Sequence, residues 1–182
     1  IHTGIWSEKA LKEAQRYGEI NIVEAGTTLN GKLAIKDQSE WSLSQDAAYV
    51  HYADNETIGG LQFAGVPEVN APLVSDLSSS ILSAPIDVSK FGLIYAGAQK
   101  NIGPAGLTIV IVRDDLLDQS RSEIPSILKY SAQAKNDSMV NTPATYSWYL
   151  SGLVFEWLLE QGGVEAIHQV NLEKAKLLYG YI

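Results

Sequence analysis

The sequence has 182 residues, of which 46% are hydrophobic and 19% charged, which is ordinary for a globular protein with one well-packed domain. Its net charge of −8 argues against a nucleic-acid or lipid-headgroup partner, because both are polyanions. The lack of cysteine excludes disulfides, thiolate chemistry and cysteine-ligated metals. No apolar run approaches the roughly 18 residues of a membrane span, and the first residues carry no signal-peptide pattern, so we expect a cytoplasmic protein.

Both ends of the sequence indicate a truncated chain. It begins at Ile1 without an initiator methionine. Its last amphipathic pattern runs into Leu177, Leu178 and Tyr179 without a capping residue. We therefore expect a fragment, or the ordered part of a longer protein.

The first part of the chain predicts short elements. Ser7 to Tyr17 is predicted as a helix, with Ser7 as its cap and apolar side chains on one face. Ile20 to Ala25 is a strand candidate, followed by a turn at Asn30-Gly31. Trp41 to Ala47 predicts a short helix, and Ala48 to Tyr52 a mostly apolar strand that leads into a polar segment.

Three short apolar runs follow, at Pro72 to Ser75, Gly92 to Gly97 and Thr108 to Val112. They are β-rich and do not alternate with polar residues, as expected for strands buried on both faces of a parallel sheet. Two long helical patterns, Thr142 to Leu159 and Val164 to Tyr179, come after them. Strands that alternate with helices predict an α/β domain with ligand chemistry at the carboxyl ends of strands.

The first long helix carries signals at both ends. Thr142 is its predicted cap, and Pro143 occupies the first helical position. Gly162-Gly163 is the predicted stop. We therefore place a helix N-terminus, with its free N–H groups, at Thr142.

Lys100 is the first candidate for chemistry. An apolar strand leads into small residues and then into this lysine, with Gly103 and Gly106 close behind. The pattern is not a phosphate-binding P-loop, in which the lysine follows the second glycine. A lysine held near apolar surface has a lowered pKa and can act as an amine nucleophile in Schiff-base chemistry. The alternative interpretation is an ordinary surface lysine.

Asp76 is the second candidate. It ends the apolar run Leu73-Val74-Ser75, an unfavourable place for a carboxylate without a partner. A pyridoxal-phosphate (PLP) enzyme needs such an acid beside the pyridine nitrogen of its cofactor. Asp76 lies 100 − 76 = 24 positions before Lys100, which suits one crossover between neighbouring parallel strands. The alternative is that Asp76 caps a helix at Ser78 to Ser80.

Several segments then resemble one family. Gly97 to Gly106 is similar, nearly residue for residue, to the lysine segment of phosphoserine aminotransferases, which are class-V aminotransferases of PLP-dependent fold type I. Further matches occur in the same order along the chain, at Thr3-Gly4-Ile5-Trp6, His51 to Ile58, Asp76 to Ser79, Asn141-Thr142-Pro143 and Trp148 to Leu153. The resemblance covers essentially the whole chain.

The resemblance implies the fold and the reaction. The fold would be the three-layer large domain of a PLP-dependent transferase, with a mainly parallel sheet. Residues 1–165 would be the later part of this domain, and residues 166–182 a connecting helix toward a small C-terminal domain that this chain lacks. The reaction would be transamination between glutamate and a phosphorylated 2-oxo acid, 3-phosphohydroxypyruvate, which gives phosphoserine in serine biosynthesis. The enzyme would be a homodimer.

The resemblance also implies roles for seven residues, and no metal site. Lys100 would hold the cofactor as a Schiff base and move the proton between substrate and cofactor, and Asp76 would hold the pyridine nitrogen. Trp6 would stack on the ring, Thr57 would bind the phenolic oxygen, and Gln99 would donate to the phosphate. Asn141 and Thr142 would reach the phosphate of the partner subunit's cofactor.

Each role has a structural alternative. Trp6 could pack at a helix entry, Thr57 and Thr142 could be caps, and Gln99 could be a turn residue. We assign His51 no role, since it lies among apolar neighbours without a second ligand at metal spacing.

Two other functions stay open at this point. The chain could belong to another PLP enzyme of the same fold, such as a cysteine desulfurase or an alanine–glyoxylate-type aminotransferase. It could also be a truncated, non-catalytic chain. The phosphate loop and the basic substrate-binding segments that the resemblance implies are absent from these residues, so the sequence does not decide substrate choice.

Overall fold

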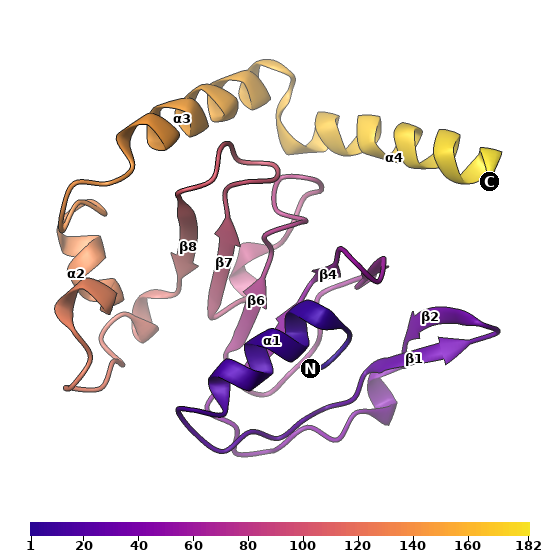
Figure 1. Cartoon of the computed structure of the whole chain (residues 1–182), viewed down its shortest axis with the longest axis horizontal. Coiled ribbons are helices and arrows are strands. Elements are labelled where there is room, and N and C mark those ends of the chain that lie inside the picture. Colours follow the sequence, from indigo (N-terminus) through magenta and orange to yellow (C-terminus); the bar gives the residue numbers. More distant parts are fainter.

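The structure is a computed structural model that describes all residues 1–182. Figure 1 shows the elements in chain order. The α-helices are α1 (Ile5–Ala14), α2 (Tyr130–Lys135), α3 (Thr145–Glu160) and α4 (Gly163–Tyr181). The strands are β1 (Gly26–Leu29), β2 (Lys32–Ile35), β3 (Val50–Ala53), β4 (Asn55–Glu56), β5 (Leu61–Gln62), β6 (Leu73–Asp76), β7 (Leu93–Gly97) and β8 (Thr108–Val112). Four 3₁₀ turns lie at Gln38–Glu40, Val88–Lys90, Asp114–Leu116 and Ser126–Leu128.

The central sheet has four strands in the order β3-β6-β7-β8. β3, β6 and β7 are parallel, and β8 is antiparallel to β7 at the edge. Figure 1 shows β6, β7 and β8 side by side. This confirms the predicted α/β fold with a mainly parallel sheet. It also places the carboxyl ends of β3, β6 and β7 at one edge of the sheet.

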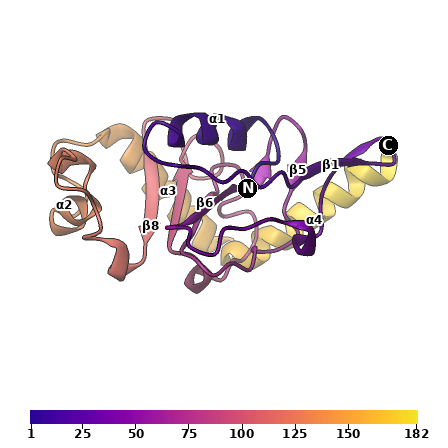
Figure 2. The ribbon, with the colours of Figure 1, turned by 90° about the horizontal axis from the view of Figure 1, so that it is seen from below.

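The two faces of the sheet bury different residues. Tyr52, Ser75 and Ile94 are register partners on one face, and the main hydrophobic core covers this face. Asp76 pairs with Tyr95 on the opposite face, because successive strand residues point to opposite sides. Helix α1 lies across this second face, as Figures 1 and 2 show.

Helix α1 begins two residues earlier than Ser7, so Ser7 is not its cap. Its hydroxyl accepts hydrogen bonds from the N–H groups of Thr3 at 2.9 Å and Gly4 at 3.0 Å. The free N–H groups of the first turn bind the side chain of Glu56, a residue 49 positions later in the chain. A distant carboxylate therefore caps the helix, and local sequence could not show it.

Two predicted elements are absent. Residues 20–25 form no strand, because only Glu24 makes a bridge, to His2, and no ladder extends from it. Residues 41–47 form no helix. Trp41 instead packs edge-on against Phe63 at 6.1 Å, and its indole N–H donates to the carbonyl of Lys36 at 3.2 Å.

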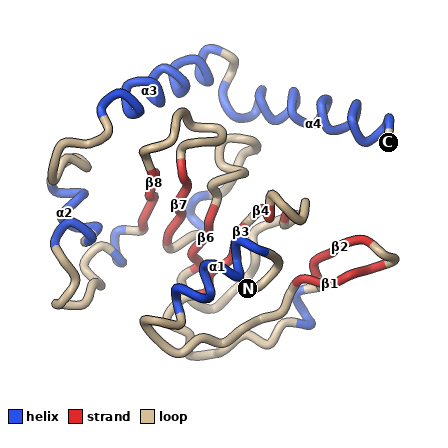
Figure 3. The backbone as a smooth tube through the Cα atoms, in the orientation of Figure 1, coloured by secondary structure: helices blue, strands red, loops and turns tan.

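The predicted turn at Asn30-Gly31 is confirmed. Both residues have positive φ, 52° and 77°, which suits a two-residue hairpin loop between β1 and β2. The hairpin extends away from the central sheet (Figure 3).

Helix α3 begins at Thr145, so the prediction that Thr142 caps it was wrong. Ala144 precedes the helix with ψ of 78°, outside the helical region, and no side chain caps the first turn. The hydroxyl of Ser147 fixes this turn by donating to the carbonyl of Ala105 at 2.9 Å. The predicted stop is confirmed, since Gly162, with φ of 93°, separates α3 from α4.

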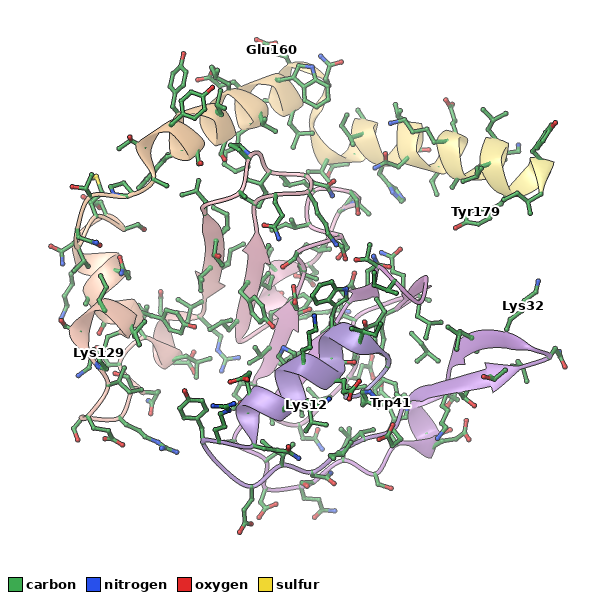
Figure 4. All side chains as sticks on the ribbon, viewed as in Figure 1. Lys12, Lys32, Trp41, Lys129, Glu160 and Tyr179 are labelled. Carbon is green, nitrogen blue, oxygen red and sulfur yellow. The ribbon has the colours of Figure 1, made fainter.

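Helices α3 and α4 form an arc beyond one end of the sheet, and Figure 4 shows Tyr179 standing clear of the other elements. Apolar side chains on both helices face solvent, with Leu159 exposed at 75% and Leu177 at 79%. Only 22 of the 182 residues are buried. A chain of this length normally buries a larger core, so these helices present surfaces that suit further protein contacts. None of the helices is long and apolar enough to cross a membrane.

Candidate functional site

Lys100 and Thr57 meet at the carboxyl edge of the sheet. The lysine follows β7, and its Nζ donates a hydrogen bond to Thr57 Oγ1 at 2.6 Å. Both side chains are exposed and so are open to a ligand. The contact joins the segment after β4 to the turn after β7, and it shows that Lys100 points back toward the end of the sheet.

The turn that carries Lys100 is tightly built. The N–H groups of Ile102 and Gly103 both donate to the carbonyl of Ala98, at 3.2 and 2.8 Å. A Cβ at Gly103 would lie 2.6 Å from Ser151 Oγ on α3, so glycine is needed here for close approach of the helix. The glycines after Lys100 therefore belong to a packed turn.

Asp76 ends β6 at the same edge. Its Oδ1 accepts the N–H of Ser78 at 2.9 Å, which closes a short turn after the strand. No helix follows this turn, so the helix-cap alternative is wrong, although the side chain does bind local backbone. The loop is tied to β7 as well, because Ser78 Oγ accepts the N–H of Gly97 at 3.0 Å.

His51 and Tyr95 form a pair on the face of the sheet that also carries Asp76. Their rings stack at 5.9 Å between centroids, and His51 Nε2 lies 2.9 Å from Tyr95 Oη. Burial lowers the pKa of His51 to about 4. Burial raises the pKa of Tyr95, and the neighbouring Asp76 carboxylate raises it further. Both side chains are therefore neutral near pH 7.

Sequence reasoning gave His51 no role. Only its position in the sheet could have indicated a role. Residues 51 and 95 lie on strands on either side of β6 and on the same face, and this depends on strand register. They line a hollow between α1 and the sheet, which does not include Lys100 or Thr57. The His51–Tyr95 pair nevertheless adjoins the candidate site through Asp76, which lies on the same face of the sheet.

Trp6 lies in the first turn of α1 and is 38% exposed. The ammonium group of Lys9 lies 4.6 Å from the centre of its ring. The backbone N–H of Trp6 donates to Glu56 Oε2 at 2.8 Å. Since Glu56 directly precedes Thr57, this contact brings the start of α1 to the Lys100–Thr57 pair. Sequence reasoning missed Glu56.

Gln99 lies against the end of β7. A Cβ at Gly97 would be 2.5 Å from Gln99 Oε1, so the amide occupies the space that a side chain there would need. Gln99 is exposed and next to Lys100 in the turn. The predicted turn position of Gln99 is therefore correct, and its amide is free to donate to a ligand at the same edge.

Asn141 and Thr142 lie apart from these residues. They line a surface hollow at the entry to α3, together with Met139, Pro143, Thr145, Trp148 and Tyr149. This hollow does not include Lys100, Thr57, Asp76 or Gln99, and no hydrogen bond joins Asn141 or Thr142 to them. The structure thus brings five of the seven expected residues to one edge of the sheet and leaves two elsewhere on the chain.

The five residues form a chemically coherent set. Lys100 supplies a primary amine that can attack a carbonyl, and Asp76 supplies a carboxylate that can hold a protonated ring nitrogen. The hydroxyl of Thr57 and the amide of Gln99 are hydrogen-bond donors, and the indole of Trp6 is a flat aromatic surface. The set suits a planar, anionic ligand with a reactive carbonyl.

Comparison with known proteins agrees with this chemistry. Residues 1–182 match the family described as Aminotransferase class-V. The chain belongs to the class-V aminotransferase family. It is 90% identical over 182 residues to the phosphoserine aminotransferase of Acinetobacter baylyi, covering 100% of this chain and 51% of that protein.

Solved class-V aminotransferases share the fold. The phosphoserine aminotransferase from Bacillus circulans subsp. alkalophilus is 43% identical with a TM-score of 0.91, over 99% of this chain and 50% of that one. The PLP-bound phosphoserine aminotransferase from Trichomonas vaginalis is also 43% identical, with a TM-score of 0.89, over 97% of this chain and 53% of that one. The chain spans about half the length of the curated relatives that it matches.

Proposed function

We propose that this chain forms the lysine-bearing part of a PLP-dependent phosphoserine aminotransferase. The reaction transfers the amino group of glutamate to 3-phosphohydroxypyruvate and gives phosphoserine. The 90% identity to a phosphoserine aminotransferase along the whole chain carries this proposal. The meeting of Lys100 and Thr57 beside the Asp76 turn supports it independently, because that set suits the cofactor's aldehyde and ring nitrogen.

Each of the five gathered residues has a proposed role. Lys100 binds the cofactor aldehyde, and Asp76 holds the pyridine nitrogen. Thr57 donates to the phenolic oxygen, Gln99 to the phosphate, and Trp6 covers one face of the ring. When bound, PLP supplies an electron sink for the carbanion that forms at the substrate Cα.

The residues of the chain do the remaining work. Lys100, once its amine is free, would be the base that takes the proton from the substrate Cα and delivers it to the former aldehyde carbon of the cofactor. Its contact with Thr57 holds the amine at the edge of the sheet, where that proton is exchanged. Asp76 keeps a negative charge fixed at the strand end, aided by the N–H of Ser78 that holds the carboxylate in one orientation.

We propose that the functional unit is a homodimer and that Asn141 and Thr142 act at the partner's site. Both are exposed, and no hydrogen bond joins them to Lys100 of their own chain, so they are free to serve another site. The apolar surfaces of α3 and α4 support further contacts, either with a partner or with the half of the protein outside this chain. We also propose that residues 1–165 and 166–182 belong to the large domain and its connection, although α4 passes position 165 without a break.

The test uses a full-length protein that carries these 182 residues. Addition of PLP is expected to give a visible absorption band from the lysine-bound cofactor. Glutamate should abolish this band, and 3-phosphohydroxypyruvate should restore it with formation of phosphoserine. Sulfide release from cysteine, or conversion of alanine with glyoxylate in place of this exchange, would assign the chain to another class-V enzyme.

A further inference from the structure

Glu56 is a buried acid that binds the backbone of Trp6 and directly precedes Thr57, two of the proposed cofactor-binding residues. It is only 1% exposed, and sequence patterns gave no hint of a role for it. Its Oε2 accepts the N–H of Trp6 at 2.8 Å, and its Oε1 accepts the N–H of Ser7 at 2.9 Å and the Ser7 hydroxyl at 2.7 Å. No basic side chain pairs with it.

A buried carboxylate without a cation is costly unless hydrogen bonds replace its water. Here the free N–H groups at the start of α1 supply those bonds, and the positive end of the helix dipole favours the charge. The approach is close: a Cβ at Gly4 would lie 2.8 Å from Glu56 Cδ, so a side chain at that position would displace the carboxylate. The contact therefore fixes the start of α1 in one place relative to β4.

The residues on either side of Glu56 extend the same arrangement. Thr57 accepts the hydrogen bond from Lys100 at 2.6 Å. Asn55 donates to the hydroxyl of Ser79 at 2.9 Å, in the loop that follows Asp76. Three successive residues thus bind the helix that carries Trp6, the turn that carries Lys100 and the loop after Asp76.

We propose that Glu56 is a positioning residue that sets the place of the Trp6 ring relative to Lys100, by fixing the first turn of α1 beside Thr57. It does not itself touch the cofactor. This inference rests on the proposed function for its catalytic consequence, but its structural core, the binding of two α1 amides by one buried carboxylate, stands independently of any ligand.

The experiment compares Glu56→Gln with Asp87→Asn in a full-length protein that carries this chain. Asp87 is a matched control, because its carboxylate also binds backbone and hydroxyl, in Ser89, but it is exposed and caps the 3₁₀ turn before β7. Glu56→Gln keeps the side-chain volume and removes the charge. Ser7→Ala removes one hydroxyl donor and keeps the carboxylate, so it serves if Glu56→Gln does not fold.

The first measurement is hydrogen exchange of the Trp6 and Ser7 amides in cofactor-free protein. We expect exchange to be about tenfold faster in Glu56→Gln, the factor that corresponds to one hydrogen bond to a charged group. The increase should be smaller in Ser7→Ala, and the exchange rate should be unchanged in Asp87→Asn. Unchanged exchange in Glu56→Gln, or in Ser7→Ala where Glu56→Gln does not fold, would overturn the proposed contact, whatever the enzyme catalyses.

The second measurement is the circular dichroism of the bound-cofactor band, with kcat and KM. We expect a reduced dichroic signal and a lower kcat in Glu56→Gln. Both quantities should keep their wild-type values in Asp87→Asn. Faster amide exchange with an unaltered dichroic signal and kcat would show that Glu56 only stabilises α1, and would overturn the positioning role. A wild-type protein that binds no PLP would refute the proposed function alone, since the exchange measurement would still report on Glu56.

Discussion

Lys100 Nζ donates to Thr57 Oγ1 at 2.6 Å, although the two residues are 43 positions apart. The contact joins the turn after β7 to the segment after β4, which follows β3, and β6 with its terminal Asp76 lies between β3 and β7 in the central sheet. It depends on parallel order: β3, β6 and β7 all end at this edge, so the residues that follow them meet.

Replacement of the lysine tests its proposed covalent role. In a full-length protein that carries this chain, Lys100→Ala is expected to abolish the cofactor that borohydride fixes to the protein, because Lys100 supplies the amine that lies against Thr57 at the proposed site. Lys90→Ala is the matched control, since Lys90 is exposed and precedes the same strand at its opposite end. Intact mass after reduction measures the attached cofactor. Full attachment in Lys100→Ala would refute the assignment.

Asp76 is expected to tolerate loss of its charge in the fold but not in the reaction. Asp76→Asn keeps an oxygen that can accept the N–H of Ser78, so the turn after β6 should persist. Loss of the fixed charge should lower kcat by on the order of 10² to 10³, as for other preorganised electrostatic groups. Thermal unfolding and steady-state kinetics measure the two effects, with Asp37→Asn as an exposed, turn-capping control. Wild-type turnover in Asp76→Asn would show that the carboxylate is structural.

The sequence predicted the strands of the sheet well because those strands are short and mostly apolar. β7, for instance, was predicted from Gly92 to Gly97 and begins one residue later. The expectation that they are buried on both faces of a parallel sheet was wrong for β8, which is antiparallel and mostly exposed at the edge of the sheet. The sequence-based prediction of a helix at residues 41–47 was wrong, because Trp41 packs against Phe63 and this tertiary contact overrides the helical periodicity. The start of α3 was misplaced for a similar reason, since contacts with Ala105 rather than a local cap fix its first turn.

The residues of the candidate site likewise fall into those that the sequence indicated and those that it did not. Lys100 and Asp76 were found because each follows an apolar strand, which is visible in the sequence. Glu56 was missed because its partners, Trp6 and Ser7, lie about fifty positions away. His51 was missed because its pairing with Tyr95 depends on strand order and register, which one sequence does not reveal.

His51 is expected to make stability depend on pH. Its pKa is lowered to about 4, chiefly by burial, while the Asp76 carboxylate opposes the shift. Between about pH 6.5 and about pH 4 the imidazole is therefore protonated in the unfolded chain but not in the folded protein. His51 does not affect the free energy of unfolding above about pH 6.5. Between about pH 6.5 and about pH 4 its protonation in the unfolded chain lowers this free energy.

Substitution measures the size of this effect. His51→Gln should remove about 2 kcal/mol of the acid-induced loss in unfolding free energy, less than the full pKa difference because the side chain is only partly buried. Urea unfolding of the full-length protein at about pH 7 and about pH 4.5 gives the comparison. His168→Gln, on α4, is the control. An identical acid loss in His51→Gln and wild type would contradict the buried, neutral histidine.

The proposed sharing of sites between subunits can be tested by mixing inactive proteins. Asn141 and Thr142 lie at the entry to α3, in a hollow that excludes Lys100, Thr57 and Asp76 of the same chain. If they serve the partner's cofactor, a full-length Lys100→Ala subunit paired with an Asn141→Ala/Thr142→Ala subunit forms one site with both defects and one with neither. Activity should then return on mixing to as much as about half of wild type per heterodimer, because one site in two is intact.

The arithmetic differs if each chain builds its own site. Both sites of the heterodimer would then keep one defect, and mixing would restore nothing. Subunit exchange is verified by native mass spectrometry, and a mixture of Lys100→Ala with Asp76→Asn is the control, since both of these residues lie at the same sheet edge of one chain. That control should show only the activity of its Asp76→Asn sites, because none of its sites combines an intact Lys100 with an intact Asp76. Recovery in the first mixture alone would place Asn141 and Thr142 at the partner's cofactor, whereas no recovery with exchange confirmed would mean that the two residues act within their own subunit.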